Sequence, residues 1–251
     1  MKLEHFSASR RTTFEQCPLK YHAIYERDME SPVHPLVLMG SGTHLMFENA
    51  TKVMLGQKEG SENPFDYVDL AVAEFGVLPE HVSLMRKLSG NALDWGYFRR
   101  TERIVGAEIK FEFELSDGTK VTGLIDRLDQ WDDVADIRDL KTQKRAFDQA
   151  SLRDNWQAKI YNIGARRLFP VITGTASVSF WVLRHQVQKV FLTADDAIRA
   201  EDDIKRASDE IRDDKDPKPK PSALCPWCPL YRECDAHRKG IRHRFKKVRK
   251  P

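Results

Sequence analysis

Residues 104–142 have the pattern of three consecutive β-strands, and this segment constrains the fold more than any other part of the chain. Apolar side chains alternate with polar ones from Val105 to Leu115, which is the period-two pattern of a half-buried strand. Asp117-Gly118 is typical of a tight hairpin turn, and Asp132-Asp133 predicts a second turn. We therefore expect strands over about 105–115, 121–131 and 134–142.

Helical patterns lie downstream of these strands. The apolar residues Trp156, Ile160 and Phe180 are assigned to the core. The elements expected there are a helix over about 149–169, strands over 176–183 and 187–192, and a charged helix capped by Thr193. Strands mixed with helices in this order predict an α/β fold with a mixed central sheet flanked by helices.

The N-terminal part is expected to be helical. A first short helix follows possible caps at Ser7 and Ser9 and ends near Cys17, before a proline, and a second follows it. The glycine-containing segment 40–43 then leads into a helix from His44 to about Leu55. On that helix His44 shares a face with the residue one turn later, Glu48.

The length of 251 residues allows one large globular domain. We expect a main domain at 1–212, a stiff proline-rich linker at 213–222, and a cysteine hook with a basic tail at 223–251. Within the main domain, 1–55 are N-terminal helices, 56–100 a helical insertion, and 101–192 the sheet with its helix. No run approaches the ~18 apolar residues of a membrane helix, and the opening lacks a secretory signal, so we expect a cytoplasmic protein without membrane contact.

The charge is unevenly distributed. From Arg238 to the end there are eight Lys or Arg and no acidic residue, whereas the whole chain has a net charge of only +3, so the remainder is acidic. A basic tail on an acidic body is typical of a nucleic-acid binder with carboxylates in its cleft. The alternatives are a solvated basic end or a tail that binds a protein partner.

Four cysteines have the spacing of metal ligands. Cys225, Cys228 and Cys234 lie within ten residues, and Cys17 lies near the other end of the chain. Disulfides are the weaker interpretation in a cytosolic chain, and unligated thiols are a further alternative. Spacing alone does not decide between zinc and an iron–sulfur cluster. The lone, distant Cys17 favours a cluster that joins the N- and C-terminal segments.

A second group of residues suits a hard divalent cation. Asp139 and Lys141 are two positions apart in one expected strand and share a face, and a neighbouring strand can bring Asp126 beside them. Two carboxylates and an amine are costly to gather unless Mg²⁺ or Mn²⁺ binds them. The alternative is that they are ordinary exposed strand residues. Glu108 lies on the polar face of its strand, where a solvated carboxylate is the usual outcome and an auxiliary ligand the alternative.

These motifs, in this order, resemble the RecB-like nucleases of the PD-(D/E)XK superfamily over nearly the whole chain. The similarity is greatest to compact CRISPR-associated-type exonucleases, which phages also encode. The matching motifs are Ser7-x-Ser9, Phe14, Cys17-Pro18 and Tyr21; Gly40 through His44; Gly123-Leu124-Ile125-Asp126; Asp139-Leu140-Lys141-Thr142; Gln157 with Tyr161; and the four cysteines.

The resemblance implies a restriction-endonuclease-like fold and a role for each matched residue. His44, Asp126, Asp139 and the main-chain carbonyl of Leu140 would bind the divalent metal, and Lys141 would be the catalytic lysine. Gln157 and Tyr161 would steady the lysine and the scissile nucleotide, and Cys17, Cys225, Cys228 and Cys234 would hold a [4Fe-4S] cluster. The chain departs from the family pattern in two places: Ile125-Asp126 replaces Pro-Asp, and Asp139 replaces the more usual Glu.

The expected function is that of a metal-dependent deoxyribonuclease. By the resemblance it is an exonuclease acting on single-stranded DNA or DNA ends in recombination, repair or replication. One alternative is an iron–sulfur or zinc-stapled protein that binds nucleic acid without cleaving it. Another is a redox or radical enzyme, but the chain has no G-x-G-x-x-G after a strand and no C-x-x-x-C-x-x-C.

Overall fold

The fold is built on a single five-stranded mixed sheet. The computed structural model describes residue 1, residues 3–99 and residues 101–236. The predicted basic tail from Arg238 onward lies outside the described residues. The strands are β1 (Ile104–Glu114), β2 (Lys120–Trp131), β3 (Val134–Lys141), β4 (Ala176–Val182) and β5 (Gln186–Leu192). They lie side by side in the order of the sequence.

The connections between the strands follow from their directions. β1, β2 and β3 form an antiparallel meander, as the alternation and the two turns predicted. β3 and β4 are parallel, so a crossover that contains a helix joins them, and β5 then pairs antiparallel to β4. The predicted α/β class with a mixed sheet is confirmed.

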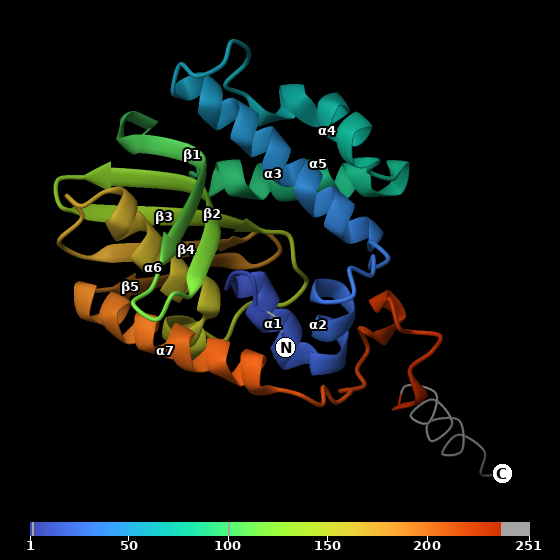
Figure 1. Cartoon of the computed structure of the whole chain (residues 1–251). Helices are drawn as coiled ribbons and strands as arrows, with labels where there is room; N and C mark the ends of the chain where they lie inside the picture. Colours follow the sequence, from blue (N-terminus) through green and yellow to red (C-terminus); the bar gives the residue numbers. More distant parts are fainter. Residues whose placement is uncertain (2, 100, 237–251) are drawn as a thin grey trace.

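Helices cover both faces of the sheet (Figure 1). One face packs on α6 (Trp156–Leu168), α7 (Ala194–Asp213) and the N-terminal helices α1 (Ala8–Gln16) and α2 (Pro18–Tyr25). The other face packs on α3 (Pro35–Met54), α4 (Val68–Phe75) and α5 (Pro79–Asp94). Short 3-10 turns are η1 (Pro64–Tyr67), η2 (Thr101–Arg103), η3 (Gln149–Asp154) and η4 (Cys225–Trp227). None of the described helices is long and apolar enough to cross a lipid bilayer.

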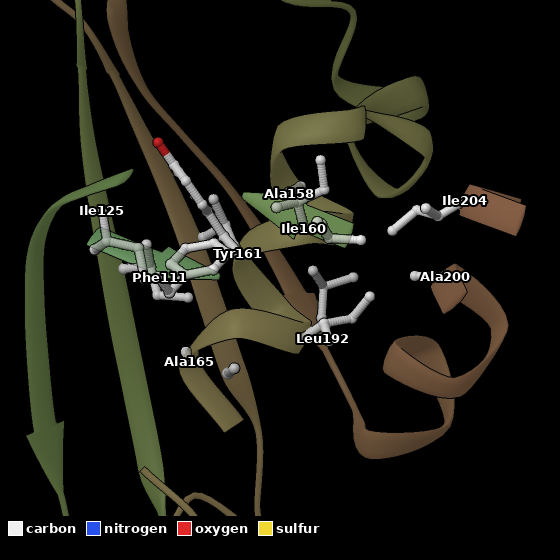
Figure 2. Close-up of a cluster of buried hydrophobic side chains, with 14 of the residues drawn as sticks. Phe111, Ile125, Ala158, Ile160, Tyr161, Ala165, Leu192, Ala200 and Ile204 are labelled. Atoms are coloured by element: carbon white, nitrogen blue, oxygen red, sulfur yellow. The ribbon is translucent and has the colours of Figure 1, made fainter. Parts of the chain in front are cut away.

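The larger core lies between the sheet and α6. Figure 2 shows α6 between Phe111 and Ile125 of the sheet on one side and Ala200 and Ile204 of α7 on the other. The Phe111 ring is so close to α6 and β2 that a Cβ on Gly164 or Gly123 would lie 2.6 or 2.2 Å from it. Gly123, part of the motif that ends at Asp126, is therefore needed for packing.

The helix that carries His44 is longer than predicted. It begins at Pro35 rather than near His44, so the glycines of segment 40–43 lie inside α3. A Cβ on Gly40 would lie 3.0 Å from the Thr142 hydroxyl, and one on Gly42 would lie 3.2 Å from the Met85 sulfur. These glycines allow α3 to approach the end of β3 and helix α5 closely, which a sequence pattern of helix breakers does not show.

The predicted helix over 149–169 is two elements. Asn155 separates η3 from α6, and its side-chain oxygen accepts hydrogen bonds from the N–H groups of Gln157 (2.9 Å) and Ala158 (3.2 Å). This N-cap ends one element and begins the next. Gln157 thus lies in the first turn of α6, at the edge of the sheet where β3 ends.

The N-terminal segment completes the sheet. Phe6 donates its N–H to the carbonyl of Lys120 (2.7 Å) and accepts from the N–H of Thr122 (2.9 Å), so it pairs with the first half of β2. The chain after α7 then runs back past α1 and α2, where the hook at 225–234 lies (Figure 1). The start of α2 and the hook, which are about 200 residues apart in the sequence, therefore lie together.

Candidate active site

The candidate site lies where β2 and β3 separate. Their ladder ends at the pair Arg127–Arg138, and both arginines donate to the carbonyl of Tyr97. Beyond this pair, the N–H of Leu140 donates to Asp126 Oδ2 at 2.8 Å instead of to a strand carbonyl. Because the N–H and C=O of one strand residue point to the same side, the Leu140 carbonyl also faces this gap.

His44 reaches the gap from α3. Its Nδ1 lies 3.2 Å from Asp126 Oδ2, and its side chain is 31% exposed. Burial opposes the charged imidazolium, but the carboxylate of Asp126 and, less strongly, that of Asp139 outweigh burial and raise the pKa of His44 to about 9. In turn His44 overcomes the effect of burial on Asp126 and lowers the pKa of that carboxyl.

Glu108 joins this pair from β1. Ala107 pairs with Arg127 and Ile109 with Ile125, so Glu108 stands opposite Asp126, although the two do not form a ladder pair. The backbone of Glu108 is left-handed, with a φ of 49°, which is uncommon for a residue with a side chain. Such strained residues concentrate at functional sites.

Glu108 is half-buried rather than fully solvated. Burial, together with the charges of Asp126 and Glu48, raises the pKa of Glu108 to about 7. The alternation predicted for β1 also fails at this end of the strand. Val105 is 38% exposed while Ile104 is buried, because the register is irregular between Ile104 and Gly106.

A second cluster surrounds Asp139, whose side chain is 1% exposed. Its Oδ1 accepts hydrogen bonds from Gln157 Nε2 (2.6 Å) and from the hydroxyl of Tyr161 (2.9 Å), and its Oδ2 lies 2.6 Å from Lys141 Nζ. Burial raises the pKa of Asp139 by more than the nearby Lys141 lowers it.

Tyr161 links this cluster to the core. Burial and then Asp139 raise the pKa of Tyr161, so its hydroxyl remains protonated and can act as a donor. In Figure 2 the Tyr161 ring starts among the core side chains and its oxygen points out of the cluster. Gln157, one helical turn earlier, also donates to that oxygen.

The structure brings all of the predicted side chains of this site to one cavity of about 530 Å³. Its titratable and polar lining includes His44, Glu48, Glu108, Asp126, Asp139, Lys141, Gln157 and Tyr161. Lys141 is 22% exposed there, whereas Asp139 is nearly inaccessible. The cavity is large enough to admit a phosphate group, and both carboxylates and an amine line it.

The donor set fits a divalent ion, but its members differ from the predicted set. Among the described residues, His44, Glu108 and Asp126 are the one group of three whose ligand atoms lie within 4.8 Å of one another. Asp139 instead contacts Gln157, Tyr161 and Lys141. Its Oδ2 forms a 2.6 Å ion pair with Lys141 Nζ. Carboxylate oxygens suit Mg²⁺ and Mn²⁺.

The four cysteines lie together at the second predicted site. All four line one small cavity of about 20 Å³ between the start of α2 and the hook, and none forms a disulfide. The N–H of Lys220 donates to Cys17 Sγ (3.3 Å), and that of Ser222 to Cys225 Sγ (3.2 Å). Burial raises the pKa of the Cys228 thiol, and Cys17 and Cys225 are close enough to raise it further.

Comparisons with known proteins agree with this fold. No curated protein matches the chain. Among solved structures, it is similar to a protein from Eubacterium rectale provisionally named an exonuclease, with a TM-score of 0.54 and 12% identity over 94% of this chain and 88% of that one. It also matches the protein named SSO0001, with a TM-score of 0.43 and 12% identity over 94% and 89% of the two chains.

The comparison with protein families gives a match over nearly the whole chain. The model of the PD-(D/E)XK nuclease superfamily matches residues 5–235, which include both the acidic site and the four cysteines. The chain therefore belongs to the PD-(D/E)XK nuclease superfamily.

Proposed function

We propose that this chain is a metal-dependent deoxyribonuclease of the RecB-like group, acting as an exonuclease on single-stranded DNA or DNA ends. Nucleases of its superfamily use divalent metals. The observation that carries the proposal is the lining of the 530 Å³ cavity, which combines His44, Glu108 and Asp126 with the Asp139–Lys141 pair. This arrangement is suited to hydrolysis of a phosphodiester.

His44, Glu108 and Asp126 would hold the divalent ion, and the Leu140 carbonyl faces the same gap. When bound, a divalent ion supplies Lewis acidity for the phosphoryl oxygen and lowers the pKa of a water molecule. The N–H of Leu140 fixes the Asp126 carboxylate by a hydrogen bond, so the side chain keeps one rotamer. Because His44 has a raised pKa, its imidazole must lose a proton before it can act as a ligand.

Lys141 would act on the phosphate. Its ammonium group extends into the cavity beside Asp139, where it can stabilise charge that develops on the phosphoryl oxygens and orient the attacking water. Asp139 is held on its other side by Gln157 and Tyr161, so these two residues position the carboxylate and, through it, Lys141.

For the four thiols we propose a [4Fe-4S] cluster rather than a zinc ion. The support is the position of Cys17, which the fold brings from the far end of the sequence to the three cysteines of the hook. Bound there, a cluster would join the start of α2 to the hook, a structural role separate from hydrolysis.

The test is an end-labelled substrate panel. Single strands, blunt duplexes and duplexes with overhangs are incubated with Mg²⁺ or Mn²⁺, and released nucleotides are resolved by size. Metal-dependent release of mononucleotides or short oligonucleotides from single strands supports the proposal. Binding of the same strands without any release would instead support a nucleic-acid-binding protein with an idle site.

A further inference from the structure

A large groove lies between the start of α3 and the cysteine hook. It has a volume of about 910 Å³, and we call it the Trp227 groove after the hook residue that lines it. Its apolar lining includes Val33, Val37, Leu224 and Trp227, and the first three are 56%, 57% and 48% exposed. These are among the most exposed large apolar side chains of the described structure. Their gathering in one hollow points to a ligand with apolar surface.

The charged residues of the groove indicate the charge of its ligand. Lys20, Lys141 and Lys144 line it, and none of the lining residues that the structure describes is acidic. The neighbouring catalytic cavity is different, because five carboxylate side chains line it. Apolar walls with lysines around them are complementary to a ligand that combines planar apolar groups with negative charge. Single-stranded DNA has both, since its bases are free to leave the stack.

An aromatic pair provides a surface for stacking. The rings of His34 and Trp227 have their centroids 4.4 Å apart, at an angle of 53°. His34 is fixed from the other side, because its Nδ1 accepts a hydrogen bond from the N–H of Leu36 (3.0 Å) as the N-cap of α3. Trp227 lies between Cys225 and Cys228 in η4, so the hook sets its position. The Trp227 ring is half-buried and borders the groove.

The groove adjoins the catalytic cavity. Ser41 and Lys141 line both hollows, so the two meet at the side chain proposed to contact the phosphate. A third hollow of about 760 Å³, which Phe147 and Trp156 line, is also lined by Lys141. A strand whose phosphate lies at Lys141 would therefore have room for its nucleotides in the adjoining hollows.

We propose that the Trp227 groove is a base-stacking subsite for single-stranded DNA next to the scissile phosphate, with Trp227 as the stacking residue. The inference rests on the proposed function. It also gives a reason for substrate preference, because the bases of an intact duplex are paired and stacked and cannot enter an apolar groove. The hook would then contribute to the substrate site as well as to the joining of the two ends of the chain.

The test uses the full chain and varies both the Trp227 side chain and the presence of bases in the strand. Binding of fluorescein-labelled oligothymidylate is measured by anisotropy in EDTA, which prevents cleavage, and compared with a strand of equal length that has an abasic tract. Trp227→Ala should weaken binding of oligothymidylate by about 5- to 100-fold, the range for loss of one base–aromatic stack. Trp227→Phe should restore most of the affinity. Phe191→Ala is the control, since Phe191 is 59% exposed on β5, outside the groove.

The abasic strand separates base stacking from backbone contact. The wild-type chain should bind the abasic strand more weakly than oligothymidylate, and Trp227→Ala should remove most of this difference. If Trp227→Ala reduced binding of both strands equally, the groove would contact the backbone only and the proposal would be wrong.

A second pair of variants changes a residue of α3 and leaves the cysteine hook unaltered. Val37 lies in the first turn of α3, where a carboxylate is favourable for the helix, so Val37→Glu should fold. The added charge should weaken single-strand binding by about tenfold, while the neutral Val37→Gln should have a smaller effect. If Trp227→Ala and Val37→Glu bind and digest single strands like the wild type, the groove proposal is wrong and an apolar peptide becomes the better occupant. A wild-type chain that binds through Trp227 but releases no nucleotide would overturn the nuclease proposal alone.

Discussion

Glu108 of β1 stands opposite Asp126 of β2, with its backbone in a left-handed conformation and its carboxylate within 4.8 Å of the Asp126 and His44 ligand atoms. Two carboxylates this close repel each other unless a proton or a cation lies between them. Burial and, after it, the charge of Asp126 raise the pKa of Glu108 to about 7. A divalent cation would remove the repulsion.

Glu108→Gln should therefore weaken Mn²⁺ binding by at least about tenfold, because it removes a charged ligand. Isothermal titration of the full chain measures the affinity directly, without turnover. Glu112→Gln is the matched control, since Glu112 is an exposed carboxylate on the same strand. Unchanged Mn²⁺ affinity in Glu108→Gln would show that this carboxylate is not a ligand.

Metal affinity should rise with pH. His44 has a pKa of about 9 and Glu108 one of about 7, and both values lie above those of the free side chains. Below pH 7 the metal must displace protons from both, and between about 7 and 9 from His44 alone, so affinity increases as each proton is lost. Mn²⁺ titrations from pH 6 to 9.5 test this slope. In His44→Gln the dependence above pH 7 should disappear, and a flat profile in the wild type would contradict the assignment.

The raised pKa of His44 should also make the stability of the metal-free protein depend on pH. The folded-state pKa of His44 is raised above its ordinary value of 6.5, so the ion pair with Asp126 stabilises the fold fully below about pH 6.5. The contribution is lost as the pH rises through about 9. Urea denaturation in EDTA should show a decline over this window that is absent in His44→Gln.

Lys141→Ala should lower the rate of single-strand cleavage by about 10²- to 10³-fold, the usual effect of removing one group that stabilises transition-state charge. Mn²⁺ affinity should remain close to that of the wild type, because the amine is not a metal ligand. Lys110→Ala, an exposed lysine of β1, serves as the control. Wild-type cleavage by Lys141→Ala would refute the proposed site.

Tyr161→Phe should reduce stability as well as activity. It removes one of the two donors to the buried Oδ1 of Asp139 while keeping the aromatic packing. Loss of a hydrogen bond to a buried carboxylate costs about 1–3 kcal/mol in the free energy of unfolding. Urea denaturation measures this change. No loss of stability would mean that the hydroxyl does not hold Asp139.

Replacing Cys17 by Ser should release the iron from the anaerobically purified chain. The wild type should contain about four iron and four sulfide ions per chain, as a [4Fe-4S] cluster requires. Because Cys17 is far from the hook in sequence, Cys17→Ser should also loosen the C-terminal segment and increase its proteolysis. Stoichiometric zinc in place of iron would overturn the cluster proposal.

Local signals in the sequence were sufficient for most of the secondary structure. The alternation and the Asp117-Gly118 turn give β1 and β2, and Thr193 begins α7 with a capping box, as expected of an N-cap residue. The hairpin turn also predicts the position of Glu108. In a hairpin closed at Asp117-Gly118, Glu114 pairs with Lys120, and counting outward puts Glu108 opposite Asp126.

Other features depended on contacts between distant segments. The glycines before His44 look like helix breakers, but they lie inside α3 because the helix packs against Thr142 and Met85. Sequence patterns indicate the conformation of residues that are neighbours in the chain. Whether a position must be glycine depends on the residues that pack against it in the folded protein.

The sequence by itself determined the strands, the caps and the residue types that can bind a metal or thiol-ligated cofactor, because these depend on short-range geometry. Only the tertiary structure decided which carboxylates face His44. β2 and β3 separate beyond Arg127–Arg138, where ligand atoms of Glu108 and Asp126 lie within 4.8 Å of one in His44, while Asp139 forms an ion pair with Lys141. The reason is physical: a strand fixes the direction of each side chain, but the divergence of two strands depends on everything that packs around them.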